Sequence, residues 1–483
     1  MTFDTRPVFF IVGALISVLA AAMMMPIIVD LRVGNPDWIV FAIASAVTLS
    51  FGVQVMLTNR TSWEALNLHQ TFLLTALAWT IVCAFASIPF MVSQIKLSPA
   101  DAYFEAMSAL TTTGSTVISG LDKLPPGLLL WRSLLQWLGG IGIIGMGIAI
   151  LPFLRVGGMQ LFRSESSDRS DKVAPRASDL AVAVTWIYLT LTVACIGALA
   201  LAGMSWFDAI NHAMTAVSTG GFSTRDASIA GWENPAIEWV LIVFMMFGGM
   251  PFVRFISLVK KGPRPFWADS QIVWYVSFLA TVSVAMAVWL SWTQDTPWLD
   301  AIRLTTFNVV SVVTTTGYAS ADYTLWGPMA MVAFFILTFV GGCTGSTSGG
   351  LKIFRFEILF IVLRMLQRRL YSPNLVIPLS YNRRPFGADI MISVMSFGFV
   401  YMTSVFILAL LLSFLGLDMI TAISGAATAV SNVGPGLGPI IGPSGNFASL
   451  PDGAKWLLAF GMLLGRLEFF TVLVVLSPAF WRQ

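Results

Sequence analysis

Four segments of the chain combine residue types that could coordinate a cation. Each opens with an aspartate, continues through small and apolar residues, and reaches a hydroxyl or amide residue shortly before a glycine. The segments are 101–115, 208–222, 300–318 and 418–436, with their glycines at Gly114, Gly221, Gly317 and Gly434. Glycine admits backbone conformations that other residues resist. Four such strands around one axis would present backbone carbonyls that replace the hydration shell of an ion.

The stretch between each aspartate and its glycine is too short to span a bilayer, so we expect a re-entrant half-helix followed by an extended loop. Such backbone is tolerated at membrane depth only where protein buries it or water reaches it. The carbonyl ends of the half-helices would point toward a bound cation. The fourth segment reads SNVGPG and lacks threonine at the aligned position. An imperfectly fourfold site should select less sharply than four identical strands.

The aspartates at the start of the four segments have two possible roles. They can cap the half-helices or interact with the positive end of the helix dipole, or they can raise the local concentration of cations. We favour the helix-capping role for all four, Asp101, Asp208, Asp300 and Asp418.

Residues 341–350 read GGCTGSTSGG and should not form a regular helix, since each glycine disfavours helix by up to about 1 kcal/mol relative to alanine. The segment interrupts an otherwise apolar span. It is either a hinge or tight packing site, or a loop that lies across a pore and moves to open it. Gly342 through Gly349 are the candidate gating residues, namely Gly342, Cys343, Thr344, Gly345, Ser346, Thr347, Ser348 and Gly349.

Arg466 lies in the last apolar span, with Glu468 two residues later. An ionisable residue inside a span costs at least about 2.5–3.5 kcal/mol on insertion and is a functional candidate by default. Residues two apart do not share a helix face, so the two side chains should have different neighbours. A structural ion pair suits Glu468 better than Arg466.

The composition places these segments in a membrane. Hydrophobic residues make up 57% of the 483 residues and charged residues only 11%, against about 25% charged in soluble domains. This excludes a soluble enzyme, a disordered chain and a nucleic-acid-binding domain. We predict an all-α integral membrane protein whose apolar runs span the bilayer. The runs are 7–29, 38–57, 70–93, 127–153, 180–203, 236–259, 271–293, 327–342, 390–415 and 454–479.

The spans and loops form a tandem repeat of span, half-helix, filter-like loop and span, preceded by two N-terminal transmembrane helices. Four covalently joined copies predict a pseudo-fourfold arrangement. The expected boundaries are 1–64 for the N-terminal helix pair, 65–176, 177–266 and 267–384 for repeats 1 to 3, and 385–483 for repeat 4. The Lys- and Arg-rich connections 155–178, 260–268 and 352–386 fall on one side, which should be cytoplasmic and hold both termini.

Two classes of function compete. A cation channel-like translocator fits the repeated loops. A sodium- or proton-coupled symporter with alternating access would instead predict inverted repeats and ionisable residues at the midplane. These repeats share one orientation, and Arg466 and Glu468 are almost the only deeply placed charges. The spans contain no recognisable catalytic set, so we expect no enzyme activity.

At these residues the chain resembles the Trk/Ktr/HKT superfamily of potassium transporters, and most of all the TrkH-type membrane subunit of bacterial Trk potassium uptake systems. The resemblance covers nearly the whole chain. Its signatures are SALTTTGST at 108–116, LQWLGGIGII at 135–144, ILPFLRVGGMQLFRSE at 150–165, GGFSTRDASI at 220–229, GGCTGSTSGGLKIFR at 341–355, SNVGPGLGP at 431–439 and MLLGRLEFFTVLVVLSPAFWR at 462–482.

The resemblance implies that the four glycines carry a potassium filter and that their neighbours supply flanking carbonyls. Those neighbours are Thr112, Thr113, Thr219, Gly220, Thr315, Thr316, Asn432 and Val433. It also supports the gating role of 341–350 and places Arg466 in the pore beside that loop.

The resemblance further implies potassium as the transported ion, with no organic cofactor in this chain, and a location in the bacterial inner membrane as a homodimer. It implies a cytosolic TrkA-type nucleotide-binding regulatory subunit. That partner, or the anionic lipid surface, would meet the basic connections, including Arg368, Arg369, Arg383 and Arg384. No nucleic acid is expected as a partner.

Overall fold

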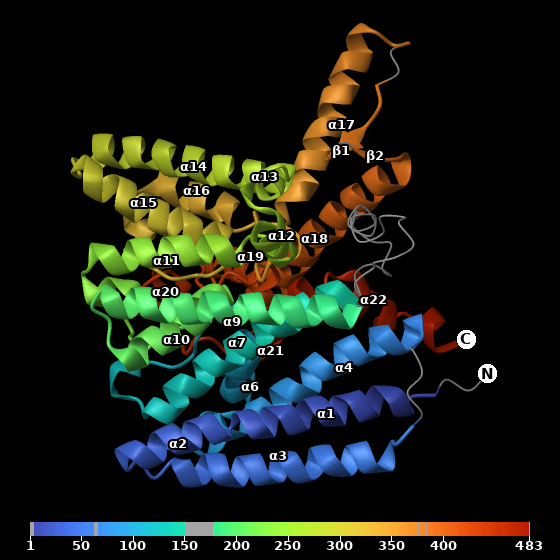
Figure 1. The fold of residues 1–483 in the computed structure, drawn as a ribbon. Helices are drawn as coiled ribbons and strands as arrows, with labels where there is room; N and C mark the ends of the chain where they lie inside the picture. Colours follow the sequence, from blue (N-terminus) through green and yellow to red (C-terminus); the bar gives the residue numbers. More distant parts are fainter. Residues whose placement is uncertain (1–3, 62–65, 150–176, 375–376, 383, 483) are drawn as a thin grey trace.

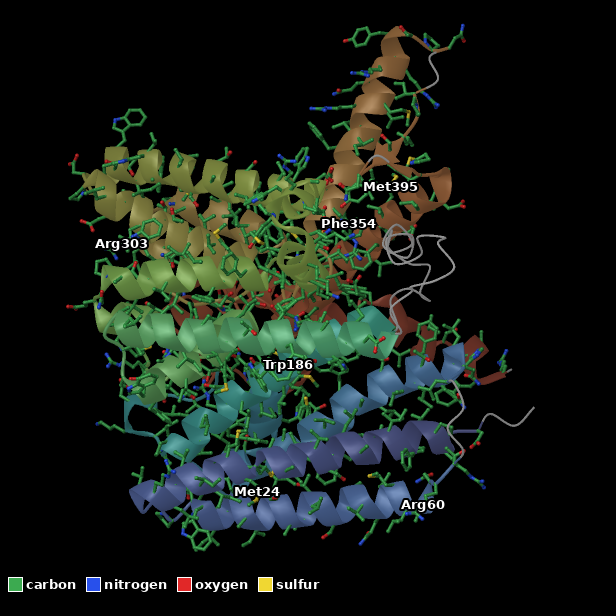
Figure 2. The ribbon with its side chains drawn as sticks, viewed as in Figure 1. Met24, Arg60, Trp186, Arg303, Phe354 and Met395 are labelled. Carbon is green, nitrogen blue, oxygen red and sulfur yellow. The ribbon has the colours of Figure 1, made fainter. Side chains whose placement is uncertain are left out.

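The chain folds into a bundle of helices in a computed structural model that describes residues 4–61, 66–149, 177–374, 377–382 and 384–482. Within these residues, seven helices are long and apolar enough to cross a membrane, or eight if one sharply bent pair counts as a single span. Large apolar side chains are exposed on the outside of the bundle, among them Met24, Trp186 and Met395, which Figure 2 labels. Because water would disfavour so much exposed apolar surface, the chain is a multi-pass membrane protein.

The N-terminal helices lie at one edge of the bundle (Figure 1). They are α1 (Arg6–Ala22), α2 (Met24–Val33) and α3 (Trp38–Thr58). A Cβ built at Gly13 would lie 2.8 Å from the carbonyl oxygen of Gly52, and one built at Gly52 would lie 2.9 Å from that of Gly13. The two glycines therefore allow α1 and α3 to approach more closely than larger residues would.

The rest of the chain repeats one pattern four times, beginning each time with a long apolar helix. These first spans are α4 (Leu68–Ala86), α9 (Ala177–Leu201), α14 (Ser270–Gln294) and α18 (Ala388–Phe414). In the first repeat, the short α5 (Ile88–Val92) continues the span after α4. Between repeats 3 and 4, the strands β1 (Ser380–Tyr381) and β2 (Arg384–Pro385) pair in antiparallel fashion.

A half-helix follows each first span, as the sequence predicts. The half-helices are α6 (Pro99–Leu110), α10 (Trp206–Val217), α15 (Trp298–Val313) and α19 (Met419–Ser431). The longest has 16 residues, which at about 1.5 Å per residue falls short of the roughly 30 Å bilayer core.

The capping pattern of the half-helices differs from the expected one. Only Asp418 is itself the N-cap residue, accepting a hydrogen bond from the Thr421 N–H at 3.1 Å. Asp101 and Asp208 lie in the first turn, where serines at 98 and 205 cap the helices and also donate to the two carboxylates. Asp300 forms an ion pair with Arg303 at 3.0 Å. All four acids remain near the positive end of a helix dipole.

The second spans depart most from the predicted apolar runs. The helices are α7 (Pro126–Ala149), α11 (Pro235–Gly248) with α12 (Phe252–Lys261), α16 (Pro328–Leu337) with α17 (Ile353–Tyr371), and α21 (Asp452–Arg466) with α22 (Phe470–Leu476). Only α7 is continuous. The run at 236–259 bends by 96° between α11 and α12. The run at 454–479 breaks where Glu468 and Phe469 have positive φ, at 57° and 51°.

Short helices complete the connections. They are η1 (Leu121–Lys123), η2 (Ser228–Trp232), α13 (Pro263–Trp267), η3 (Tyr323–Trp326), α20 (Gly438–Ile441) and η4 (Pro478–Arg482). In Figure 1 the N and C marks both lie at the right of the bundle, and α17 projects from its upper right. The signature at 150–165 and most of the basic connection 155–178 lie outside the described residues, as does Arg383.

Candidate functional site

The strands that follow the half-helices share one backbone conformation. In each strand the motif glycine and the residue two positions before it have positive φ. The φ values are 53° at Thr112 and 88° at Gly114, 53° at Thr219 and 76° at Gly221, 59° at Thr315 and 82° at Gly317, and 56° at Asn432 and 110° at Gly434. The left-handed region is costly for threonine. The structure therefore holds the first three strands in a strained conformation, which asparagine in the fourth adopts more readily.

The four strands form a closed ring. A Cβ built on each motif glycine would crowd the carbonyl oxygen of the residue that precedes the glycine of the next repeat. The pairs are Gly114 with Gly220, Gly221 with Thr316, Gly317 with Val433, and Gly434 with Thr113. The order 1–2–3–4–1 is that of a pseudo-fourfold axis. The structure thus brings together all four predicted strands, and we call the carbonyl oxygens of Thr113, Gly220, Thr316 and Val433 the ring oxygens.

The ring opens into a cavity on the side away from the half-helix ends. Residues of all four strands line it, including the four motif glycines. Arg132, Arg225 and Asp226 also line this cavity. Arg132 is paired with Glu105 at 2.8 Å, and it donates to the Ser223 carbonyl oxygen at 3.0 Å. The arginine therefore joins the first two repeats beside the ring, and its charge is balanced by a buried carboxylate.

The four strands have unequal support behind the ring. In repeats 1 and 3, hydroxyl pairs connect Thr111 with Thr113 at 2.8 Å and Thr314 with Thr316 at 2.7 Å. In repeat 4, the Asn432 side-chain amide donates to the Thr113 hydroxyl at 2.9 Å. The imperfect fourfold symmetry expected from the sequence is thus visible in these hydrogen bonds.

The segment 341–350 leaves the helical path between α16 and α17, which confirms the predicted break. Its backbone is bound to the bend between α11 and α12. The Cys343 N–H donates to the Gly249 carbonyl oxygen at 2.8 Å, and the Phe252 N–H donates to that of Gly345 at 3.0 Å. The Thr344 N–H donates to the Gln271 side chain at 2.9 Å. The loop is therefore an ordered structure fixed by repeat 2 and by α14.

The same loop is hydrogen-bonded to two strands of the ring. The hydroxyl of Thr347 is 3.2 Å from that of Thr219, and the Gly349 N–H donates to the Thr315 hydroxyl at 2.7 Å. Within the described residues, the hydroxyl of Thr112 has no hydrogen-bond partner. The loop thus contacts strands 2 and 3 through the hydroxyls at this position and leaves the matching hydroxyl of strand 1 unpaired.

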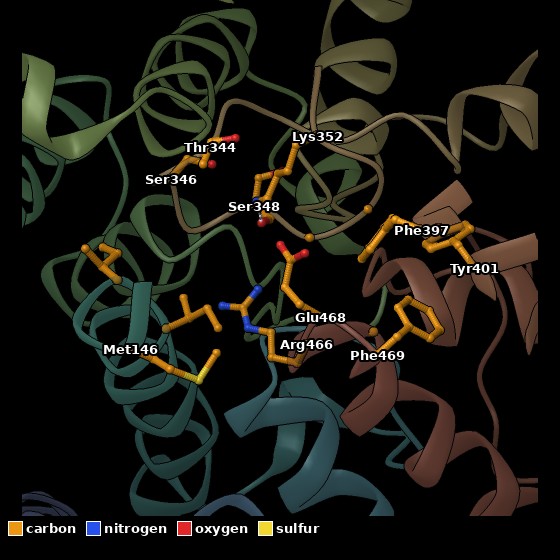
Figure 3. A pocket seen from close by; sticks show the side chains of 16 residues that line it. Met146, Thr344, Ser346, Ser348, Lys352, Phe397, Tyr401, Arg466, Glu468 and Phe469 are labelled. Carbon is orange, nitrogen blue, oxygen red and sulfur yellow. Dashed lines mark hydrogen bonds between the residues drawn. The ribbon is translucent and has the colours of Figure 1, made fainter. Parts of the chain in front are cut away.

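Arg466 reaches this loop from the end of α21 (Figure 3). Its Nη1 donates to the Thr347 carbonyl oxygen at 2.8 Å, and the side chain is only 3% exposed. Glu468 instead pairs with Arg355. The different neighbours predicted for Arg466 and Glu468 are confirmed, as is the structural ion pair expected for Glu468.

Lys352 is a site residue that sequence reasoning missed, because it was assigned to a basic connection. It is buried, and its ammonium group donates to the Ser348 carbonyl oxygen. Lys352, Arg466 and Glu468 line a second cavity on the opposite side of the loop from the ring, together with Ser346 and Ser348 (Figure 3). A lysine directly after SGGL, at the start of a helix, is a weak signal from which its burial could not have been predicted.

Comparisons with known proteins identify the family of this chain. A family model described as "cation transport protein", TrkH, matches residues 39–483. The chain is 48% identical over 478 residues to the Trk system potassium uptake protein TrkI of Halomonas elongata, covering 99% of this chain and 97% of that one. It is 36% identical over 484 residues to the Trk system potassium uptake protein TrkH of Escherichia coli K12, covering 99% of each.

A solved structure has the same fold. The crystal structure of the potassium transporter TrkH from Vibrio parahaemolyticus matches with a TM-score of 0.92 and 33% sequence identity, covering 99% of this chain and 100% of that chain. Since both the family model and these full-length relatives match, the chain belongs to the TrkH family of cation transport proteins.

Proposed function

We propose that this chain carries potassium ions into the cell through the ring of backbone carbonyls described above. The observation that carries the proposal is the closed cyclic contact among Gly114, Gly221, Gly317 and Gly434. Relatives of nearly the same length are named as potassium uptake proteins. Carbonyl oxygens around one axis can replace the water around a potassium ion. An inside-negative potential then favours entry by about 2.3 kcal/mol per charge for each 100 mV.

We also propose the predicted residues as the ion site, with Thr112, Thr113, Thr219, Gly220, Thr315, Thr316, Asn432 and Val433 flanking the glycines. The half-helices end immediately before these strands, so their negative ends favour a cation in the ring. The loop 342–349 with Arg466 is proposed as the gate, because it lies between the ring and the second cavity and contacts Thr219 and Thr315.

Coupled transport by alternating access is not favoured. The four repeats follow one another in the same orientation around the ring, whereas alternating access commonly relies on inverted repeats. The repeat boundaries at 64, 176, 266 and 384 are retained as part of the proposal. We propose no enzyme activity and no organic cofactor in this chain.

The proposed setting is a bacterial inner membrane, with both termini and the basic connections in the cytoplasm. A homodimer and a cytosolic TrkA-type nucleotide-binding regulatory subunit complete the proposal, supported by the naming of the relatives as parts of Trk systems. In the described part of these connections, Arg368 and Arg369 of α17 are exposed and available to a partner or to anionic lipid.

The full chain reconstituted in liposomes provides the test. A potassium gradient should drive uptake of radioactive rubidium, and the reversal potential should follow the potassium gradient alone. A reversal potential that shifts with an imposed proton or sodium gradient, at a fixed potassium gradient, would support the coupled symporter instead. Liposomes with protein but no rubidium uptake beyond protein-free vesicles would contradict the proposed function.

A further inference from the structure

Gln136 is a fully buried glutamine in the middle of α7 that none of the roles above requires. Its Nε2 donates to the Gly220 carbonyl oxygen at 2.6 Å, and its Oε1 accepts from the Phe222 N–H at 3.0 Å. A carbonyl oxygen can only accept and a backbone N–H can only donate, so the two partners fix the orientation of the amide. One side chain from repeat 1 therefore brackets the motif glycine of strand 2.

The oxygen that Gln136 binds is one of the four ring oxygens. Across the described residues, no hydrogen bond reaches the ring oxygens of Thr113, Thr316 or Val433. The carbonyl of Gly220 is thus the member of the ring that a side chain holds. A buried amide destabilises the fold unless it is hydrogen-bonded. The two hydrogen bonds of Gln136 therefore offset the cost of burying its side chain.

Gln136 also accounts for the second glycine of strand 2. The other three strands have a side chain at this position, in Thr113, Thr316 and Val433. A Cβ built on Gly220 would lie 2.5 Å from Oε1 and 2.9 Å from Nε2 of Gln136, too close for either atom. The amide of Gln136 therefore occupies the space that a side chain at residue 220 would need, and the two residues form a complementary pair.

The equivalent helices of repeats 2 and 4 carry methionine at this position. Gly139, Gly248 and Gly465 each face the carbonyl oxygen of the residue four positions before a motif glycine, which aligns α7, α11 and α21. Three residues before these glycines stand Gln136, Met245 and Met462, all fully buried. The alignment marks Gln136 as a polar residue at a position where α11 and α21 carry an apolar one.

We propose that Gln136 is a positioning residue that sets the discrimination between potassium and sodium, an inference that rests on the proposed function of the ring. Sodium is smaller than potassium and needs oxygens closer to the axis. A ring oxygen bound to α7 resists such an inward movement, which penalises sodium more than potassium. The hydrogen bond from Gln136 also draws electron density away from that oxygen. The oxygen therefore attracts a cation less strongly, and this weakens the binding of the smaller sodium ion.

The test replaces Gln136 with methionine, the residue found on α11 and α21. The Gln136→Met protein, reconstituted in liposomes, should still take up rubidium. Its sodium-to-potassium permeability ratio from reversal potentials should rise about fivefold, the effect of losing roughly one hydrogen bond. Gln70→Met is the matched control, because Gln70 is also buried and bonded to backbone but lies at the start of α4. Its ratio should equal that of the unmodified protein.

A second variant approaches the same contact from the strand. Gly220→Ala should displace the Gln136 amide and raise the ratio in the same direction. In the double variant the sodium-to-potassium permeability ratio should be little higher than in either single variant, because both substitutions act on one contact. If Gln136→Met cannot be recovered folded, Gln136→Asn, whose amide is one methylene too short to bracket the strand, takes its place with the same expectation.

The outcomes separate this inference from the proposed function. An unchanged ratio in folded, conducting Gln136→Met or Gln136→Asn protein, alongside a raised ratio in a Gly317→Ala protein, would overturn the role of Gln136 alone. An unchanged ratio in all of them, Gly317→Ala included, would overturn the assignment of the ring itself. A loss of total flux at an unaltered ratio would show that Gln136 is merely structural.

Discussion

The guanidinium group of Arg466 donates to the carbonyl oxygen of Thr347 at 2.8 Å, joining the last repeat to the loop of the third. Nε and Nη2 of Arg466 have no hydrogen-bond partner within the described residues. Arg466 therefore supplies both a hydrogen bond to the loop 341–350 and a buried positive charge, at the point where this loop narrows the proposed pathway. Both should disfavour passage of a cation.

Replacing Arg466 with alanine should raise rubidium uptake into liposomes several-fold, because it removes both the electrostatic barrier and the anchor of the loop. Arg466→Lys is the control, because it keeps the charge but loses the planar donor group. Its rubidium uptake should lie between that of the unmodified protein and that of Arg466→Ala. Equal uptake by all three proteins would show that Arg466 serves packing only.

Shortening the loop within Thr344–Ser348 should also raise the flux, since it removes the contacts of Thr347 with Thr219 and with Arg466. The loop deletion and Arg466→Ala act on one barrier, so their combined effect should be smaller than the product of the separate effects. A deletion that leaves flux unchanged or lowers it, in well-folded protein, would identify the segment as a structural hinge.

Alanine at Gly221 or Gly317 should abolish rubidium uptake or relax exclusion of sodium. Both glycines have positive φ, at 76° and 82°, and a Cβ at either would overlap a ring oxygen. Gly398→Ala in α18 is the matched control, because nothing lies within 4 Å of its Cβ position. Growth of a potassium-uptake-deficient host at low potassium provides the assay. Normal growth with unaltered sodium exclusion in both ring variants would remove these glycines from the filter.

Lys455 of α21 forms an ion pair with Asp101 of α6 at 2.5 Å, with side-chain exposures of 5% and 21%. Lys455→Met should destabilise the protein by about 2 kcal/mol, less than for a fully buried pair because Asp101 keeps some contact with water. Thermal unfolding in detergent measures the loss, with substitution of the exposed Lys96 as control. Asp101→Asn should affect stability more than flux. The reverse pattern would indicate that Asp101 concentrates cations.

Charge reversal at Arg368 and Arg369 should weaken co-purification with a TrkA-type subunit from the same cell. Both side chains are exposed near the end of α17, which projects from the bundle (Figure 1). Charge reversal at Arg32 is the control and should leave co-purification unaltered, because Arg32 lies in α2, outside the four repeats. If reversal at Arg368 and Arg369 does not change the amount recovered, the partner docks elsewhere or the contact is with lipid.

The ring was predictable from sequence because its signal is repeated four times, and each copy needs the same glycine for the same backbone reason. Gly114, Gly221, Gly317 and Gly434 meet in the structure as the repeat required. The interruption at 341–350 was equally clear, since so many glycine and hydroxyl residues disfavour helix. These features depend on local backbone preference, which composition reveals.

The contacts among distant residues were not predictable in this way. The break after Arg466 depends on positive φ at Glu468 and Phe469, and neither residue type favours that conformation. Lys352 looked like one more basic residue beside a membrane, yet tertiary packing buries it under the loop. The role of Gln136 follows only from its contact with Gly220, which lies 84 residues away along the chain.

The loop between α16 and α17 has no counterpart in the other three repeats among the described residues. In a channel assembled from four identical subunits, a loop of this kind would be copied four times and would crowd the same small space. A single polypeptide removes that constraint, since gene duplication lets each quarter diverge. Repeat 3 can then supply the loop and repeat 1 can supply Gln136, while the four strands around the ion stay nearly symmetric.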